Sequence, residues 1–478
     1  MEGRLLGRLA HLGNLGPMLL LTGCASFSPD GGMGTVQVIA TTELGKNVGR
    51  MQSDADATEI QTRVRTLLRG PLGVEDAVQI ALLNNRGLQV SFAELAVADA
   101  ERVQASLPPS PTISLSRLAA TGYLEIERQV IVNVLQLATL PRRAEIAEVR
   151  FAQARLRSGQ AVLRLAAETR RSYYRAVAAG RLVGFLEESK TAAEAASELS
   201  RKLGETGAVN KLHQAREHAF YAELGTQLAT ARLRRETERE QLTRLMGLWG
   251  SDVQYRLPAA LPELPARPKT LRQIEADAIE QRIDLCVARM ELDALAKSFG
   301  LTTATRFVTD LEVAGISKFE RDGADRTKSK GAEVEFQIPI FDFGEARERQ
   351  AEALYMQTIH RLADLAINIR SEARTAYQTY RAAYDISMQY QKEVLPLRKI
   401  ISDETLLQYN AMIADPSELL VDARNRISSN VAAIEAKRDF WLATINLRAA
   451  VVGGGAGSGG ETEVATRAAP QAEAGGHD

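Results

Sequence analysis

Residues 332–344 read Ala-Glu-Val-Glu-Phe-Gln-Ile-Pro-Ile-Phe-Asp-Phe-Gly. Apolar and polar side chains alternate through this stretch, the apolar ones being Val334, Phe336, Ile338 and Ile340 and the polar ones Glu333, Glu335 and Gln337. A period of two predicts a strand whose two faces meet different surroundings. From Glu345 onward the pattern is helical. Pro339 and Gly344 suit the turn between strand and helix, because proline fixes φ and glycine adopts conformations that other residues avoid.

The segments around this junction predict one helix, two strands and two long helices. The first helix is expected over 271–297, and strands are expected over about 303–319 and 332–341, joined by the charged stretch 321–330. Long helices follow over 345–409 and 417–451, with a break at 410–416 that contains Pro416.

The first half of the chain shows the same plan. Shifting the sequence by 197 positions places Leu88 on Leu285 and Ala81 on Ala278. The corresponding elements are a helix over 74–104, strands over 112–116 and 124–134, and helices over 142–201 and 210–246. The sequence therefore predicts a twofold internal repeat.

These strands and helices need partners. Two strands per half do not make a stable sheet, and a long isolated hairpin leaves apolar surface uncovered. Self-assembly is therefore expected. The alternation suits an outer-membrane barrel, with apolar side chains toward lipid and polar ones toward water, and it equally suits a half-buried sheet in a soluble protein. Taken alone it favours the soluble protein, because alternation is a weak signal for a membrane strand.

The N-terminus changes that preference. Arg4 and Arg8 precede the run 12–21, which is apolar apart from Asn14 and ends in Leu-Thr-Gly-Cys at 21–24. This order is typical of an export signal, and the run is shorter than the roughly 20 residues of a transmembrane helix. Leu-Thr-Gly-Cys also resembles the bacterial lipoprotein signal, in which residues 1–23 are removed and Cys24 carries the lipid. Ala25, in place of an aspartate, indicates the outer membrane.

Composition argues against several classes of function. The chain has 478 residues with 59 Lys and Arg against 60 Asp and Glu, so its net charge of −1 disfavours a basic nucleic-acid binder. The two cysteines and five histidines form no CxxC, HExxH or comparable cluster, and no phosphate-binding glycine loop or nucleophile elbow is present. We predict no catalytic, cofactor-binding or metal-binding residues, and therefore no enzyme.

With these features assembled, the chain resembles the outer membrane efflux protein family of TolC-like channels, in its lipoprotein branch. The resemblance extends over about residues 74–451. It depends on the opening Val-Glu-Asp-Ala-Val-Gln-Ile-Ala-Leu-Leu-Asn-Asn at 74–85, on the junction 336–344 with Pro339 and Gly344, on the repeat, and on the tips of the helical hairpins.

The resemblance implies a mainly α-helical homotrimer with a transmembrane β-barrel part. Each chain would give four strands to one twelve-stranded outer-membrane barrel and its helical hairpins to an α-helical tunnel across the periplasm. A periplasmic adaptor and an inner-membrane transporter would deliver the substrates. The chain would be a passive outer-membrane exit duct, with the covalent lipid on Cys24 and without a cofactor.

The resemblance also points to the two hairpin tips as the surfaces that meet the adaptor. Both tips contain Leu-x-x-Ala-Arg. The residues concerned are Gly207, Asn210, Leu212, Ala215 and Arg216 in the first tip, and Asn410, Leu420, Ala423 and Arg424 in the second.

Acidic residues of the second tip resemble the narrow periplasmic end of the family. Glu418 occupies the matching position, with Asp415 and Asp422 close by. Under threefold symmetry one carboxylate becomes a ring that selects cations. Alternatively, these residues only offset the exposed amides and the dipole at the start of a helix.

The predicted organisation has six parts. They are the signal peptide 1–23, an N-terminal periplasmic segment 24–70, a first repeat 71–257, a proline-rich linker 258–269, a second repeat 270–451 and a disordered Gly/Ala-rich tail 452–478. The repeats place strands at about 111–137 and 303–341, and helical hairpins at about 142–248 and 345–451.

Two other interpretations stay open. A periplasmic adaptor lipoprotein would have a single helical hairpin with a small β-domain inserted at its tip, whereas this chain predicts two hairpins that follow their strands. A structural coiled-coil scaffold of the envelope leaves the strand pairs without a role.

Overall fold

The computed structural model describes residues 26–207, 209–411 and 413–455. The predicted signal peptide, Cys24 and nearly all of the predicted tail lie outside these residues. The first half contains α1 (Met33–Ile39), a π-helical turn (Ala40–Leu44), α2 (Asp54–Leu67), α3 (Val74–Asn84), α4 (Arg86–Ser106), β1 (Thr112–Ala120), β2 (Tyr123–Asn133), α5 (Val134–Glu205), α6 (Lys211–Leu245) and a 3-10 turn (Gly250–Val253). The second contains α7 (Ile274–Gln281), α8 (Ile283–Ala304), β3 (Asp310–Asp322), β4 (Asp325–Gln337), α9 (Glu345–Gln389), a π-helical turn (Tyr390–Val394), α10 (Leu395–Asn410) and α11 (Pro416–Val452).

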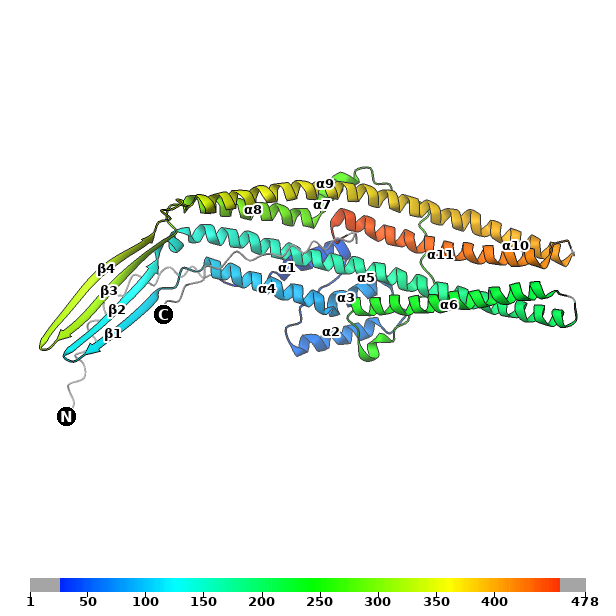
Figure 1. Cartoon of the computed structure of the whole chain (residues 1–478), viewed down its shortest axis with the longest axis horizontal. Coiled ribbons are helices and arrows are strands. Elements are labelled where there is room, and N and C mark those ends of the chain that lie inside the picture. Colours follow the sequence, from blue (N-terminus) through cyan, green and yellow to red (C-terminus); the bar gives the residue numbers. More distant parts are fainter. Residues whose placement is uncertain (1–25, 208, 412, 456–478) are drawn as a thin grey trace, which may run out of the picture.

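The molecule is elongated, with the sheet at one end and the tips of two helical hairpins at the other (Figure 1). One hairpin consists of α5 and α6, and the other of α9 to α11, with α4 and α8 lying beside the long helices at the sheet end. The 72 residues of α5 span about 108 Å at 1.5 Å per residue. None of the described helices combines the length and the apolar composition needed to cross a bilayer.

The four strands form one antiparallel sheet in the order β1-β2-β3-β4. Pairing of β2 with β3, from Tyr123 opposite Asp322 to Asn133 opposite Glu312, joins the two halves of the chain. The outer edges of β1 and β4 have no strand partner among the residues that the structure describes.

The charged stretch 321–330 is not the connection that the sequence predicted. The turn is confined to Gly323 and Ala324, and the flanking residues continue β3 and β4. The alternation persists there, with Arg326, Lys328 and Lys330 on one face. Because those positions hold charges instead of apolar residues, a hydrophobicity pattern does not reveal the strand.

Residues 134–137 also differ from the sequence prediction, since they are helical. The Asn133 side chain accepts a hydrogen bond from the Gln136 amide at 2.8 Å and so caps α5 at this point. The helix therefore begins before Pro141, which lies inside it.

Both short helical segments that precede the strands are interrupted. The backbone leaves the helical conformation at Asn85, between α3 and α4, and at Arg282, between α7 and α8. The two residues are 197 positions apart and have nearly identical dihedral angles, φ −68° with ψ 119° and φ −68° with ψ 120°. Leu88 and Leu285, which follow them, are both buried.

The long helix expected over 345–409 is also interrupted, by the π-helical turn Tyr390–Val394. Pro396 follows in the first turn of α10. Proline has no N–H and clashes with the preceding turn, so a locally widened helix accommodates it.

The N-terminal segment packs against the long helices. Val36 of α1 and Ala40 are fully buried in a cluster with Phe92 of α4 and Val162 of α5. The Ser28 amide donates to a carboxylate oxygen of Asp99 at 2.8 Å, which fixes the segment to α4.

Aromatic side chains tie the two halves together at mid-length. Tyr174 of α5 stacks on Trp441 of α11 with ring centroids 5.3 Å apart. The Trp441 indole N–H donates to the Pro262 carbonyl at 3.1 Å, so the linker is held at the same place.

The junction between β4 and α9 contains two consecutive left-handed residues, Phe343 with φ +49° and Gly344. Gly344 has φ +77°, and a Cβ built on it would overlap the carbonyl group of Arg306. The Phe343 amide donates to the Pro339 carbonyl at 2.7 Å, and an Asp342 carboxylate oxygen accepts from the Gly344 amide at 3.0 Å. The sheet is thereby set at a fixed angle to α9.

We expect Gly344→Ala to destabilise the fold by at least about 1–2 kcal/mol, because an L-residue is strained at this φ and the new methyl group meets backbone. The control is Gly300→Ala in α8, where the added methyl group has open space and should stabilise the helix by about 0.5–1 kcal/mol. Thermal unfolding of the purified variants measures both. Equal melting temperatures for the two variants would contradict the role of Gly344.

Candidate functional site

The strand register separates the sheet into two chemically different faces. The acidic face carries nine carboxylates and one lysine, Lys318; the carboxylates are Glu125, Glu127, Asp310, Glu312, Glu320, Asp322, Asp325, Glu333 and Glu335. The opposite face carries no Asp or Glu in the four described strands. Near the helices it is wholly apolar, with Ile113, Val130, Val132, Leu311, Val313, Val334 and Phe336.

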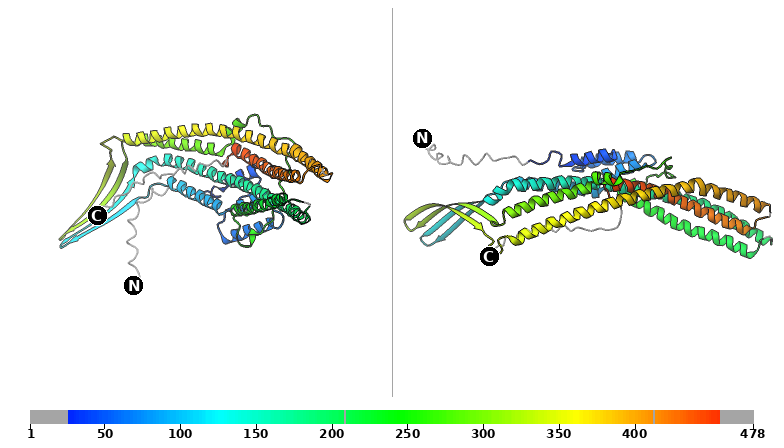
Figure 2. Two further views of the ribbon diagram at one scale, coloured as in Figure 1. Left: turned by 45° about the vertical axis from the view of Figure 1, so that its right-hand side comes forward. Right: turned by 90° about the horizontal axis from the view of Figure 1, so that it is seen from above.

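The acidic face is the concave one. Along β3, Glu312, Ala314 and Ile316 are buried or half-buried, whereas Val313 and Gly315 between them are exposed. Side chains on the inside of a curved sheet shield one another, and Figure 2 shows the four strands as a curved ribbon. We therefore call the opposite side the convex face.

Few charges on the acidic face are neutralised. Lys318 lies 3.1 Å from Glu125 and 3.9 Å from Glu320. The other carboxylates of this face form no ion pair with any described residue; Gln129 donates to Glu333 at 3.1 Å. The concave surface is therefore strongly negative.

Sequence reasoning assigned no role to most of these carboxylates. The signal was present in Leu-Glu-Ile-Glu at 124–127, where acids alternate with apolar residues. The remaining carboxylates of this face were not recognised because 321–330 was predicted to be a loop. Which residues share a face depends on the strand register, and that register requires the full length of the strands.

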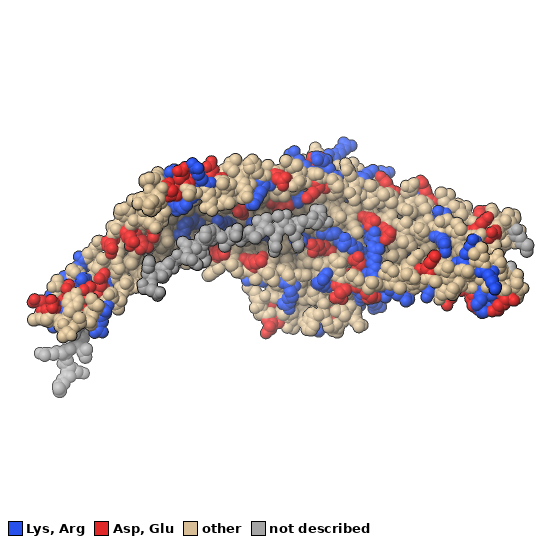
Figure 3. Space-filling view, in the orientation of Figure 1, with Lys and Arg blue, Asp and Glu red and all other residues tan. Residues whose placement is uncertain are grey.

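Charged side chains also gather at the far end of the molecule, where the two hairpin tips lie (Figure 3). In the first tip Gly207 has φ +77°, and the Asn210 side chain caps α6 by accepting from the His213 amide at 2.8 Å. Leu212, Ala215 and Arg216 are exposed. These three residues present a free surface on the single chain.

Several residues of the second tip contact the other hairpin. Asn410 ends α10 and is exposed, whereas Leu420 is buried among residues of α5 and α6. Ala423 is half-buried in the same cluster. The Arg424 guanidinium lies over the Phe220 ring at 5.2 Å and pairs with Glu223 at 3.1 Å. The two Leu-x-x-Ala-Arg motifs thus have different surroundings, and Arg424 links the hairpins.

The three acidic residues of the second tip do not share one environment. Asp415 and Glu418 are exposed, whereas Asp422 is only 8 % exposed and its Oδ1 atom has no hydrogen-bond partner among the described residues. Asp422 therefore faces the packed interior between the hairpins in the single chain, and not open solvent.

Asp415 is a helix cap. Its carboxylate accepts from the hydroxyl and the amide of Ser417, and these hydrogen bonds hold its pKa below the usual value of 3.8. Nearby, burial raises the pKa of Glu217, whose carboxylate lies 3.7 Å from His213. Glu217 was missed by sequence reasoning, which considered only the motif residues.

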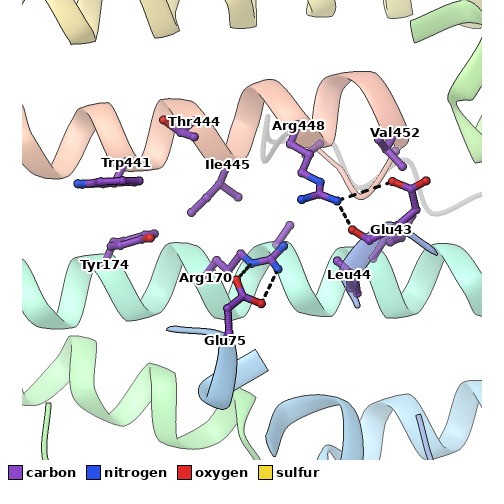
Figure 4. A pocket seen from close by; sticks show the side chains of 14 residues that line it. Glu43, Leu44, Glu75, Arg170, Tyr174, Trp441, Thr444, Ile445, Arg448 and Val452 are labelled. Atoms are coloured by element: carbon purple, nitrogen blue, oxygen red, sulfur yellow. Dashed lines mark hydrogen bonds and ion pairs between the residues drawn. The ribbon is translucent and has the colours of Figure 1, made fainter. Parts of the chain in front are cut away.

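Tyr174 and Trp441 line a cavity of about 180 Å³ between α5, α11 and the N-terminal segment (Figure 4). Arg170 pairs with Glu75 at 3.0 Å, and Arg448 pairs with Glu43. Burial raises the pKa of Glu75, but the hydrogen bond and charge of Arg170 outweigh it, so the net shift is downward. The charges are mutually satisfied, which indicates a structural junction. Among the described residues no cluster of His, Cys, Asp and Glu could hold a metal ion.

Known proteins match this chain in their three-dimensional structures. No protein-family model and no curated protein sequence matches the chain. One solved structure that matches is that of CusC, which was described together with conformational changes that accompany folding and transmembrane channel formation. It has 17 % identity and a TM-score of 0.66, and the match covers 80 % of this chain and 92 % of that one. The outer-membrane channel OprN matches at 18 % identity and TM-score 0.65, covering 87 % and 95 %.

The open state of the MtrE outer-membrane channel of Neisseria gonorrhoeae matches at 16 % identity and TM-score 0.65, covering 80 % of this chain and 89 % of that one. At such identities the likeness concerns the fold. The chain has the fold of the TolC-like outer-membrane channels. The predicted fold class, mainly helical with a four-stranded β-part, is confirmed.

The cap at Asp415 gives a pH prediction. A carboxyl whose pKa is lowered by folding stabilises the fold above its unfolded pKa, and this contribution is lost as pH falls through the folded pKa. We expect the first-turn amides of α11 to lose hydrogen-exchange protection, relative to intrinsic rates, over the acid interval below about pH 4.

The control is Asp415→Asn, which retains a capping oxygen but does not titrate. Its protection should not change over this interval. If the wild type and Asp415→Asn lose protection equally, Asp415 is not the titrating cap.

Proposed function

We propose that the chain is the outer-membrane channel of a tripartite efflux or secretion system. Three lipidated copies would form a passive duct that conducts substrates across the periplasm and the outer membrane. The observation that carries this proposal is the two-faced sheet, apolar outside and acidic inside, at the end of long helical hairpins. A lipid-embedded, water-filled barrel needs that distribution.

The open edges of the sheet support assembly. Within a bilayer an unpaired backbone group costs several kcal/mol, so a membrane sheet must close on itself. The four strands alternate in direction, which makes β4 of one copy antiparallel to β1 of the next. Three copies would close the twelve-stranded barrel that the family resemblance implies, and strands of 9 to 13 residues are long enough.

The first hairpin tip is proposed as the main adaptor contact. Leu212, Ala215 and Arg216 are exposed there, whereas Leu420 and Arg424 of the second tip are occupied within the chain. Gly207, Asn210, Asn410 and Ala423 would shape the tips. An inner-membrane pump would supply the energy.

An adaptor is less well supported. It would have a single hairpin with the β-domain inserted at the tip, whereas here the sheet lies at the opposite end from two hairpin tips (Figure 1).

The function is tested on the outer-membrane fraction extracted in detergent. We expect a native mass of three chains starting at a lipidated Cys24, and discrete conductance steps after reconstitution into planar bilayers. A monomer that does not conduct would contradict the proposal.

The acidic face predicts cation preference. Glu333→Gln with Glu335→Gln should lower the cation-to-anion permeability ratio severalfold, because each lost charge is repeated in every copy. The control, Lys318→Gln, removes the only base of the same face and should leave the ratio unchanged or raise it. Reversal potentials in a salt gradient measure the ratio. A fall of equal size in both variants would show that the effect is not electrostatic.

The variant Glu418→Gln tests the contribution of the hairpin tip to ion selectivity separately from the contribution of the barrel. If Glu418 contributes to a selective ring at the periplasmic end, its loss should lower the permeability ratio in an otherwise wild-type barrel. An unchanged ratio would remove Glu418 from the proposed gate and leave it as an exposed residue of the first turn of α11. Asp415 is a cap and Asp422 is buried, so we propose neither as the primary ring residue.

A further inference from the structure

The convex face of the sheet carries a band of positive charge that the channel function does not use. Six bases lie on this face and all are exposed, namely Arg117, Arg128, Arg321, Arg326, Lys328 and Lys330. We call them the basic band. No acidic strand residue shares the face.

The basic band occupies one level of the sheet. The bases fall on three successive rows of paired residues, counted from the hairpin turns toward the helices. The first row holds Arg321 and Arg326, the second Lys328 and Arg117, and the third Lys330 and Arg128. The rows beyond them, toward the helices, are apolar, with Val130, Val313 and Val334 among their members. The bases are thus confined to the rows near the turns, which they share with apolar residues such as Leu124, Ile126 and Phe319, and the rows toward the helices are uncharged.

None of these six bases pairs with an acid within the described residues. Unpaired Arg or Lys on the lipid side of a barrel costs about 2–4 kcal/mol at the bilayer midplane and about 0–1 kcal/mol near the interface. Near the turns, six exposed and unpaired bases therefore form a positively charged surface that complements an anionic partner outside the chain.

We propose that the basic band binds the phosphate groups of a phosphorylated glycolipid in the outer leaflet. This inference rests on the proposed function, which places the convex face against lipid. Guanidinium groups bind phosphate through two parallel N–H donors, and lysine binds it as a point charge. Long side chains can also lean toward the headgroups while their stems cover apolar surface.

The height of the band favours a glycolipid over a phospholipid. Three rows span four residues, about 14 Å along a strand and about 10 Å along the barrel axis at a tilt near 45°. The headgroup layer of an ordinary phospholipid bilayer is roughly 5–7 Å thick on each side. A phosphorylated sugar headgroup is larger than the headgroup of a phospholipid, so a glycolipid would extend over more of the band.

The test uses the full-length trimer and native mass spectrometry with four probes. They are bis-phosphorylated lipid A, the same lipid with its phosphates removed, phosphatidylglycerol and inorganic phosphate. The variant is Arg326→Gln/Lys328→Gln/Lys330→Gln, which changes one strand only. Lys328→Arg/Lys330→Arg is the conservative variant, and Lys318→Gln removes one positive charge from the acidic face as a control.

We expect the wild type, the conservative variant and Lys318→Gln to bind bis-phosphorylated lipid A with similar Kd. The triple variant should bind it roughly a hundredfold more weakly, at about fivefold per base near an anionic surface. Dephosphorylated lipid A and phosphatidylglycerol should bind weakly to all variants, and inorganic phosphate should not compete at equal concentration. Trimer mass should be the same throughout, and conductance should be the same for the wild type, the triple variant and the conservative variant.

Equal affinity of the triple variant and the wild type for bis-phosphorylated lipid A would overturn the proposal. Equal binding of phosphatidylglycerol would overturn the choice of a glycolipid, and base-dependent association of two trimers would identify another copy as the occupant. Base-dependent lipid A binding in a preparation that does not conduct would support the basic band while contradicting the proposed channel function.

Discussion

Pairing between β2 and β3 is the interaction on which the rest of the structure depends. It joins strands from the two halves of the chain into one sheet, and it fixes which residues share a face. Within the described part of the chain, the outer edges of β1 and β4 remain unpaired. A backbone edge within a membrane needs a partner, so in the proposed outer-membrane channel the single chain would be incomplete.

The long helices connect the sheet to the hairpin tips at the other end of the molecule. α5 starts directly after β2, capped by Asn133, and α9 starts after the left-handed Gly344. At mid-length Tyr174 and Trp441 hold the two hairpins and the linker together. At the far end Arg424 pairs with Glu223 across the hairpins. The spacing of the tips therefore depends on packing that begins at the sheet.

Charged residues are distributed differently on the two faces of the sheet and at the hairpin tips. The concave side of the sheet is acidic, the convex side is apolar and then basic, and the tips carry acids that differ in exposure. A cargo passing through the proposed channel would meet negative charge in the barrel, while the surrounding lipid would meet positive charge near the turns. The nearly zero net charge of the whole chain conceals this separation.

The sequence by itself determined the order of the elements, because periods of 3.6 and 2 and the positions of proline and glycine are local properties. It predicted the junction at Pro339 and Gly344, both hairpins and the fold class. It misplaced the connection at 321–330 and the start of α5, where charge replaces hydrophobicity or a side-chain cap decides the boundary. Only the tertiary structure decided which carboxylates share the acidic face, that Leu420 is buried while Leu212 is exposed, and that Asp422 faces inward while Glu418 faces solvent. Those properties depend on strand register and on contacts between residues hundreds of positions apart, which no local pattern contains.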